Sequence, residues 1–221
     1  MENIVLFGVG EFAEVCYVYF EEDSDFNVVG FTVNQEYISE PDIFGKPVVP
    51  FEEVETYFPT NDFGMFVAVG YKRVNKARAE IYSACKGKGY QLVTYVSSRV
   101  TRFGNPKIGE NCFIFENNVI QPYVEIGDNV IMWSGNHIGH HSRIGNHCFL
   151  ASHAVISGNV TIGEFCFVGV NSTFRDGVNV APDCVIGAGA LILKDTKPAA
   201  VYAVKGTEVF PRKSSELKSF Q

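Results

Sequence analysis

The feature that most constrains the fold is a large apolar residue that recurs at every sixth position. From Ile108 to Ile192 the series holds fifteen positions with no break in register. An α-helix would spread such a series over drifting faces, and a plain strand would repeat every two residues. The period of six instead predicts a triangular parallel β-helix, in which each unit forms one side of a coil. The positions are Ile108, Ile114, Ile120, Ile126, Met132, Ile138, Ile144, Leu150, Ile156, Ile162, Val168, Phe174, Val180, Ile186 and Ile192.

Three such units complete a coil, so residues eighteen apart are expected to stack, and the fifteen units form five coils. Tight corners are expected directly after the aliphatic positions, because glycine tolerates turn conformations. The glycines in question are Gly109, Gly127, Gly139, Gly145, Gly163, Gly169 and Gly187. Cysteines precede four of the aliphatic positions by two residues, and we expect them to pack inward rather than to act as nucleophiles. They are Cys112, Cys148, Cys166 and Cys184.

The first hundred residues follow a different pattern. Apolar runs of strand length at 4–7 and 28–33 flank a helix-like segment at 12–20, which predicts a β-α-β unit. A buried strand is expected at 65–69, a helix at 75–86 and a further strand at 91–96. We therefore divide the chain into a small parallel α/β domain at 1–100, a β-helix at 101–194 and a C-terminal cap at 195–221.

The turn after the first strand is rich in glycine. It reads Gly8-Val9-Gly10-Glu11-Phe12-Ala13, close to the motif that brings backbone amides near phosphates at a helix N-terminus. Ala13 stands where a full dinucleotide fingerprint has its third glycine, and Asn34 stands where it has an acid. The glycine-rich turn is compatible with nucleotide contact or with a tight turn that binds no ligand. We do not expect a unit this short to bind a whole NAD.

Composition and charge exclude several classes of partner. The chain has 18 basic and 25 acidic residues, a net charge of −7, so a nucleic-acid partner is not expected. Met1-Glu2-Asn3 leads straight into an apolar strand without the features of a signal peptide, and no stretch is long enough to span a membrane. We expect a cytoplasmic protein with no membrane partner, whose six cysteines are free thiols.

A histidine-rich segment lies in the middle of the predicted β-helix: Asn136-His137-Ile138-Gly139-His140-His141-Ser142-Arg143-Ile144-Gly145. The chain, with this segment in a hexapeptide β-helix that follows a small Rossmann-like domain, resembles one bacterial family. The chain is similar, over nearly its whole length, to the nucleotide-amino-sugar N-acyltransferases. These include acetyltransferases for UDP-4-amino sugars of protein N-glycosylation and for GDP-perosamine, and relatives described as sialic acid O-acetyltransferases.

The resemblance implies both a fold and an activity. The fold is an α/β N-terminal Rossmann-like domain joined to an all-β left-handed parallel β-helix. The activity is transfer of an acyl group from acetyl-CoA, or another acyl-CoA, to the amino group of a nucleotide-linked amino-deoxy sugar. Such reactions serve the synthesis of surface glycans such as lipopolysaccharide O-antigen, capsule or glycoprotein. The family also implies a homotrimer with active sites between adjacent β-helices, and no metal.

All five histidines fall within seventeen consecutive residues. The family pattern is an aliphatic residue, then one further residue, then a histidine and an acid. In the family this histidine is the base that deprotonates the sugar amine. His140 matches that histidine, while His141 stands in place of the acid, so the group that orients His140 stays open. His137 and His147 are expected to be structural.

Candidates for acyl-CoA binding follow from the same resemblance. The family has a glycine one coil above the base, in a Gly-Asn pair, whose N–H faces the thioester carbonyl. Gly158-Asn159 matches this pair, and Gly158 is eighteen residues after His140, so it should also leave an open pocket there. His153 is a further candidate. Lys205-Gly206 resembles the family's closing segment near the end of CoA, although the Pro-Ala that follows in the family is missing.

Candidates for nucleotide-sugar binding lie in the loops that follow the strands of the α/β domain, where open sheets bind ligands. They are Gly8, Gly10, Glu11, Asn34, Gly70, Tyr71 and Asn75. We expect direct attack of the amine on the thioester, with His140 as base and the Gly158 N–H as oxyanion donor.

Three other functions are compatible with parts of the pattern. The same base could activate a sugar hydroxyl, as in a sialic acid type O-acetyltransferase. A non-catalytic hexapeptide-repeat binding subunit would hold a ligand without turnover. A zinc carbonic anhydrase on a trimeric β-helix is disfavoured, because its histidine ligands span about two coils and these five histidines do not.

Overall fold

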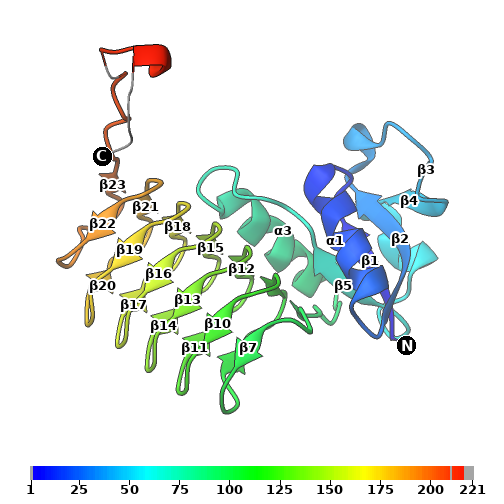
Figure 1. The fold of residues 1–221 in the computed structure, drawn as a ribbon. Helices are drawn as coiled ribbons and strands as arrows, with labels where there is room; N and C mark the ends of the chain where they lie inside the picture. Colours follow the sequence, from blue (N-terminus) through cyan, green and yellow to red (C-terminus); the bar gives the residue numbers. More distant parts are fainter. Residues whose placement is uncertain (1, 210, 217–221) are drawn as a thin grey trace.

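A computed structural model describes residues 2–209 and 211–216 of the chain. Figure 1 shows an α/β part at the N-terminus, a β-helix of stacked triangular coils beside it, and a C-terminal segment that leaves the last coil. No helix in the described part of the chain is long and apolar enough to cross a membrane.

The α/β part is built on a five-stranded sheet in the order β3-β4-β2-β1-β5. Its members are β1 (Glu2–Phe7), β2 (Phe26–Val33), β3 (Asp42–Ile43), β4 (Lys46–Pro50) and β5 (Gly64–Val67). All neighbours are parallel except β3, which pairs antiparallel with β4 at the edge. Central strands of this kind are covered on both faces, and Ile4, Val5 and Leu6 of β1 are fully buried. The strands predicted at 4–7, 28–33 and 65–69 are confirmed to within about two residues at each end.

Two long helices follow β1 and β5. They are α1 (Glu11–Glu22) and α3 (Lys76–Gly87), which match the segments predicted at 12–20 and 75–86. A short α2 (Val54–Tyr57) and the 3-10 turns η1 (Gln35–Tyr37), η2 (Phe51–Glu53) and η3 (Ser214–Glu216) complete the helical elements of the described residues. α3 lies between the sheet and the β-helix (Figure 1), so one of its faces is available to join the two parts.

The strand predicted at 91–96 is wrong as a single strand of this sheet. Leu92 forms only an isolated bridge with Met65, whereas Tyr95–Val96 forms β6 and pairs with β9 of the β-helix. The apolar run at 91–96 is divided between two sheets, because the chain passes here from the five-stranded sheet to the β-helix. The first strand of the β-helix therefore lies before residue 101.

The β-helix consists of two-residue strands, one on each side of every coil. They are β6 (Tyr95–Val96), β7 (Thr101–Arg102), β8 (Lys107–Ile108), β9 (Phe113–Ile114), β10 (Val119–Ile120), β11 (Glu125–Ile126), β12 (Ile131–Met132), β13 (His137–Ile138), β14 (Arg143–Ile144), β15 (Phe149–Leu150), β16 (Val155–Ile156), β17 (Thr161–Ile162), β18 (Phe167–Val168), β19 (Thr173–Phe174), β20 (Asn179–Val180), β21 (Val185–Ile186), β22 (Leu191–Ile192) and β23 (Val201–Tyr202).

Every predicted aliphatic position is the second residue of one of the strands β8 to β22. All of them are buried except Ile108, which packs against the same core from the first coil. Strands three apart pair in parallel with partners eighteen residues apart, such as Ile120 with Ile138 and Ile138 with Ile156. The predicted parallel coil is confirmed, and the stacked sheets are consistent with a left-handed β-helix.

The pairing produces three flat sheets, which we name after their first strands. The β6 sheet contains β6, β9, β12, β15, β18, β21 and β23; the β7 sheet contains β7, β10, β13, β16, β19 and β22; the β8 sheet contains β8, β11, β14, β17 and β20. Each coil passes through the three sheets in turn, so every coil contributes three corners. Side chains at one corner form a column with a spacing of eighteen residues.

The structure explains the glycines that follow the aliphatic residues differently from the prediction. The left-handed residue of each corner stands three positions after the aliphatic residue and is most often asparagine, as at Asn111 and Asn129. The glycine directly after the aliphatic residue has ordinary dihedral angles. A Cβ on Gly145 would lie 2.7 Å from the amide nitrogen of Glu164 on the next coil. Close approach of coil to coil, rather than a positive φ, excludes a side chain there.

The inward cysteines behave as predicted. Cys112, Cys148, Cys166 and Cys184 are completely buried in the core of the β-helix, and all six cysteines of the chain are free thiols. The Cys148 Sγ donates to the Gly163 carbonyl at 3.0 Å, and burial raises the pKa of this thiol. A buried neutral thiol is a small packing group, so these residues are not nucleophiles.

The C-terminal segment closes one end of the solenoid. β23 adds to β21, and Tyr202 packs against the core of the last coils. Beyond it, residues 203–209 are exposed, and Figure 1 shows the chain extending away from the β-helix. Residues 210 and 217–221 of the predicted cap lie outside the described residues.

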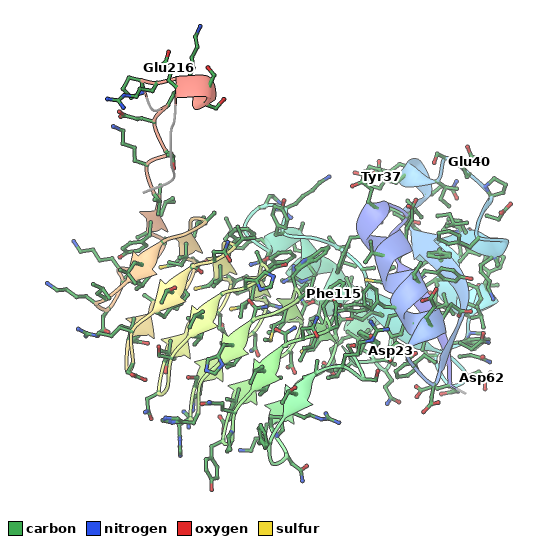
Figure 2. The ribbon with its side chains drawn as sticks, viewed as in Figure 1. Asp23, Tyr37, Glu40, Asp62, Phe115 and Glu216 are labelled. Carbon is green, nitrogen blue, oxygen red and sulfur yellow. The ribbon has the colours of Figure 1, made fainter. Side chains whose placement is uncertain are left out.

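Aromatic side chains join the two parts of the molecule. Phe113 and Phe115, on the outer face of the β6 sheet and at its corner, pack against Tyr19 and Phe20 of α1 with ring centroids 4.8–6.0 Å apart. Phe115 also stacks on Trp133 at 4.5 Å. Figure 2 labels Phe115 at this junction, with Asp23 at the end of α1 close by. The α/β part is therefore seated on the β6 sheet.

Arg78 of α3 anchors this contact from its centre. The side chain is fully buried, and its guanidinium donates to the carbonyls of Gly70 (2.9 Å), His147 (3.0 Å) and Cys148 (3.0 Å). It also donates to the Asn129 and Asn75 side chains, each at 3.2 Å. Burial lowers the pKa of Arg78 to about 10, which still leaves the group protonated at neutral pH. One cation thus satisfies carbonyls from both parts of the chain.

Arg78→Met should lower the free energy of unfolding by about 3 kcal/mol or more, because the buried carbonyls lose their donor. Urea unfolding at fixed protein concentration measures this. Arg143→Met is the matched control, since the Arg143 side chain is 68% exposed beside Glu125 and such pairs contribute about 0–1 kcal/mol. Equal losses in the two variants would show that the carbonyl cage does not stabilise the domain contact.

Candidate active site

His140 lies at a corner between the β7 and β8 sheets. β13 ends at Ile138 and β14 begins at Arg143, so residues 139–142 form the turn. The turns stacked in this column are 121–123, 139–141, 157–159 and 175–177, and we call the column the His140 corner. The inward aliphatic residues on either side hold each turn in register with the next.

Backbone and side-chain bonds to the neighbouring coils fix the position of His140. Its N–H donates to the Gln121 Oε1 at 2.9 Å, and its carbonyl accepts from the Asn159 N–H at 2.8 Å. The imidazole is exposed on the surface of the corner. The base candidate is therefore held by two coils while its ring stays accessible.

His141 contacts His140 through the ring nitrogens. The two Nδ1 atoms are 3.2 Å apart, so one of them donates a proton and the other accepts it. His141 occupies the left-handed position of its turn, with φ +60°, and its ring lies 4.6 Å from the Tyr123 ring one coil below. When the His140 Nδ1 is the donor, the lone pair of His140 is on Nε2.

Gly158 lies directly against the free edge of the His140 ring. A Cβ at position 158 would be 2.7 Å from the His140 Cε1 and 2.8 Å from its Nε2. The Gly158 amide N–H makes no hydrogen bond within the described residues, although its carbonyl accepts from the Gly177 N–H at 3.0 Å. The His140 ring thus stacks on Gly158, as the eighteen-residue spacing predicted, but Gly158 is buried and the ring occupies the space where an open pocket was expected.

The five histidines do not form one cluster. His147 lies at the corner between the β8 and β6 sheets, with its Nδ1 2.9 Å from the Asn129 Nδ2 and its ring beside Tyr82 and Phe165. Burial, followed by the nearby charge of Arg78, lowers the pKa of His147. His147 is therefore a neutral packing residue.

His153 and His137 occupy two further places. His153 lies at the third corner, between the β6 and β7 sheets, where its ring covers Gly135 at 2.5 Å from the position of a Cβ. His137 belongs to β13 and is half-buried on the face of the β7 sheet. Within the described residues no group of three or more His, Cys, Asp or Glu side chains could hold a metal ion. In a single chain, His153 does not meet His140 and Gly158.

The glycine-rich turn connects β1 to α1. Gly8 has φ +131°, and a Cβ there would lie 2.7 Å from the Ala68 carbonyl oxygen, so this position requires glycine. Gly10 caps α1 without a side-chain bond, and nothing lies within 4 Å of its Cβ position. The Cα of Gly10 therefore faces open space at the start of α1, next to the exposed Glu11.

The remaining candidates of the α/β part have different environments. Asn34 is exposed, and its Nδ2 donates to Glu52 at 3.1 Å. Nothing lies within 4 Å of the Cβ position of Gly70, and its carbonyl accepts a hydrogen bond from Arg78. Asn75 is completely buried, and its Nδ2 donates to the Cys166 carbonyl at 3.1 Å. Asn75 thus joins the two parts of the chain and offers no surface to a ligand, contrary to its prediction as a nucleotide contact.

Tyr71 borders an apolar hollow that the sequence analysis missed. Its ring packs against Phe149 at 4.9 Å and Phe167 at 5.0 Å on the β6 sheet, yet the residue is 56% exposed. The hollow measures about 400 Å³ and also includes Trp133, whose buried Nε1–H has no partner within the described residues. Aromatic residues separated by one or two coils, each one residue before an aliphatic position, are the sequence signal for this face: Phe113, Phe149 and Phe167.

Lys205 and Gly206 lie after β23 in the exposed segment. Lys205 pairs with Glu208 at 2.6 Å, and both side chains are largely exposed. Nothing lies within 4 Å of the Cβ position of Gly206. Neither residue contacts the His140 corner in the described part of the chain.

Comparison with known proteins identifies the repeat. Residues 105–140 and 159–194 match the family model of the bacterial transferase hexapeptide (six repeats). A comparison with curated protein sequences finds no match. The β-helix predicted from the period of six is thus also recognised as a hexapeptide repeat.

Solved structures share the whole architecture. The acetyltransferase domain of PglB from Neisseria gonorrhoeae is 20% identical with a TM-score of 0.78, over 91% of this chain and 96% of that one. PerB from Caulobacter crescentus, solved in complex with CoA and GDP-perosamine, is 23% identical with a TM-score of 0.77, over 92% and 93%. WeeI from Acinetobacter baumannii is 18% identical with a TM-score of 0.76, over 91% and 97%. The likeness establishes a common fold for the α/β part and the β-helix together.

Two glycines of the corner should respond differently to alanine. In Gly139→Ala the Cβ would lie 2.5 Å from backbone atoms of Gly158 and Ser157, so the coils must separate at a cost of about 1–3 kcal/mol. In Gly158→Ala the three atoms nearest to the Cβ belong to the side chains of His140 and Asp176, which can rotate, and the change should stay within about 0.5 kcal/mol.

Urea unfolding compares the stabilities of the two variants. Nuclear magnetic resonance of the imidazole Cε1–H signals should show displacement of the His140 ring in Gly158→Ala, while the His147 signal stays unchanged. Equal destabilisation by both substitutions would contradict this difference between the two glycines.

Proposed function

We propose that this chain is an acyl-CoA-dependent N-acyltransferase that acylates the amino group of a nucleotide-linked amino-deoxy sugar, with acetyl-CoA as the expected donor. The observation that carries the proposal is the placement of the His140 Nε2 against Gly158, whose amide N–H makes no hydrogen bond within the described residues. PerB, which shares the fold, was solved with CoA and GDP-perosamine, and this supports the same pair of substrate classes here.

The chemistry needs a base, an oxyanion donor and a free amine. The amine nitrogen attacks the thioester carbon while the Gly158 N–H donates to the developing oxyanion. The proton leaves the nitrogen for the His140 Nε2, the C–S bond breaks, and the thiolate of CoA takes that proton back. No covalent acyl-enzyme is required, because all six cysteines are buried and none can reach a substrate.

His141 takes the place of the acid that the resembling family has beside its base. The contact between the two Nδ1 atoms lets His141 accept the His140 Nδ1–H and so keep the His140 Nε2 free. Stacking on Tyr123 holds the His141 ring in this position. We assign His141 to orienting the base, with proton transfer left to His140.

We propose that the acyl-CoA lies along the His140 corner beside Gly158 and Asn159, in a homotrimer whose adjacent β-helices share each site. The outer face of the β7 sheet supports such an assembly, because it carries Val119, Val155 and Leu191, and Val155 and Leu191 are 41% and 61% exposed. A shared site would also let His153, Lys205 and Gly206 of one chain approach the His140 corner of the next.

The α/β part, predicted as residues 1–100 but ending before β6 (Tyr95–Val96), is proposed as a Rossmann-like nucleotide-sugar-binding domain, followed by the acyltransferase β-helix and the C-terminal cap. Gly8, Gly10 and Glu11 would lie near the phosphates, since the Cα of Gly10 faces open space at the start of α1. Asn34 and Gly70 border the same end of the sheet. Tyr71 and the hollow beside Trp133 would receive apolar parts of the acceptor, with the Trp133 Nε1–H as a ready donor.

The proposed acceptor suggests a setting. Nucleotide-linked amino sugars and acyl-CoA are cytoplasmic metabolites, and the products feed surface glycans such as lipopolysaccharide. We therefore propose a cytoplasmic enzyme of glycan synthesis, with no metal in the reaction and neither a nucleic acid nor a membrane as partner.

A mass-spectrometric screen tests the function. UDP-, dTDP-, GDP- and CMP-linked amino sugars are incubated with acetyl-CoA, and the expected product is heavier by one acetyl group and resistant to mild base, as an amide is. A base-labile product would indicate sugar O-acetylation. Binding of these ligands without turnover would indicate a hexapeptide-repeat binding subunit.

His140→Ala should lower turnover on the order of 100-fold or more, the scale of lost general-base catalysis, while both substrate affinities stay near wild type. His141→Ala should cost less, and His141→Asn should retain most activity, because asparagine tolerates the left-handed turn and offers an acceptor for the His140 Nδ1–H. Steady-state kinetics, with sedimentation equilibrium to check assembly, measures these effects. A dead His141→Ala beside an active His140→Ala would reverse the assignment of the base.

A further inference from the structure

Asp176 lies two coils above His140 in the same column, with Gly158 between them. Its Oδ1 is 3.1 Å from the position that a Cβ of residue 158 would take, and the His140 Nε2 is 2.8 Å from that same position. No ion pair joins Asp176 to His140 within the described residues. The two groups therefore meet over the Cα of Gly158, one from each neighbouring coil.

Asp176 differs from the other acids at the corners because its carboxylate has no structural partner in the described part of the chain. Asp128 accepts the Glu110 N–H at 3.0 Å, and Glu164 accepts the Asn146 Nδ2 at 3.0 Å. Glu110, Glu116, Asp183 and Asp195 are likewise bonded to neighbouring groups. The folded coil thus uses those acids to join turns, whereas Asp176 presents an exposed and unpaired charge beside the base.

A carboxylate at this place has a defined effect on the proposed reaction. An aliphatic amine is a cation near neutral pH, whereas a sugar hydroxyl is neutral, so a nearby carboxylate attracts the first and not the second. Positive charge also grows on the nitrogen as it attacks and then on the His140 ring as it takes the proton. Because His141 has replaced the acid beside His140, Asp176 is the carboxylate that the corner column offers to balance this charge.

We propose that Asp176 binds the amino group of the acceptor and makes the site selective for amines over hydroxyls. The inference rests on the proposed N-acyltransferase function and deepens it. The bound ammonium loses one proton to solvent, and the free amine attacks the thioester carbon. The second proton passes to the His140 Nε2, and the departing thiolate removes it. Asp176 itself exchanges no proton in this sequence and acts through its charge.

The isosteric variant Asp176→Asn tests the charge alone. With the amino sugar that wild type acylates best in the screen, kcat/KM for the acceptor should fall about 10- to 100-fold, while the KM for acetyl-CoA changes by less than about threefold. Asp176→Glu keeps the charge and should retain more activity than Asp176→Asn. Glu164→Gln is the matched control, because Glu164 has the same place in its turn at another corner, and it should behave as wild type.

Binding separates selectivity from a general loss of activity. Calorimetry with the amino sugar and with its hydroxyl analogue should show that Asp176→Asn weakens binding of the amine and leaves the hydroxyl analogue unchanged. Thermal melting of the variants should match that of wild type, since Asp176 bonds to no other described residue.

Two outcomes would overturn the inference without touching the proposed function. One is an active wild type with an Asp176→Asn variant whose amine selectivity is unchanged. The other is a variant that loses affinity for acetyl-CoA and not for the acceptor, which would place Asp176 against the donor instead. A wild type that acylates no amine in the screen would refute the proposed function and this inference together.

Discussion

The close approach of consecutive coils is the constraint on which the rest of the molecule depends. Inward aliphatic residues at every sixth position bury one side of each unit, and the glycines that follow them let backbone meet backbone at about van der Waals distance. This contact fixes the spacing of eighteen residues at every corner. The backbone spacing of His140, Gly158 and Asp176 is a consequence of that contact, so these three positions are as fixed as the coils themselves. A loop of equal length could hold the same side chains, but not at a set separation.

A second contact decides where the α/β part sits. The outward aromatic residues of the β6 sheet would be exposed in a free β-helix, and α1 and Tyr71 pack against them. Arg78 adds direction to this apolar contact, because its guanidinium must meet carbonyls from Gly70, His147 and Cys148 at once. The loop that carries Gly70 and Tyr71 is thereby held against the β6 sheet. The α/β part brings its strand ends toward the β-helix through packing that involves no residue of the His140 corner.

The β-helix could be predicted almost completely from sequence, because a strict period leaves only one geometry that buries every sixth residue. The stacking of Gly158 on His140 followed from counting alone. Other features depend on contacts between distant segments, and local patterns do not contain them. Asn75 follows a strand as a ligand-binding residue would, yet it is buried against the Cys166 carbonyl. The apolar run at 91–96 divides between two sheets. The role of the corner glycines was misread because glycine serves both for a positive φ and for close approach, and only the structure separates these.

The presence of His141 in place of an acid separates two roles at the His140 corner: setting the tautomer of His140 and balancing the charge of its imidazolium. An acid beside the Nδ1 of the base would set the tautomer and balance the charge of the imidazolium with one side chain. A neutral imidazole can set the tautomer through its Nδ1, but it adds no negative charge. In this chain the carboxylate stands at Asp176, on the Nε2 side of the ring and across Gly158. Under the proposed role of Asp176, charge balance lies on the side from which the acceptor enters, where it also acts on the substrate. Because His141 replaces the acid of the resembling family, the negative charge that balances the imidazolium has to come from another residue, and Asp176 is placed to supply it.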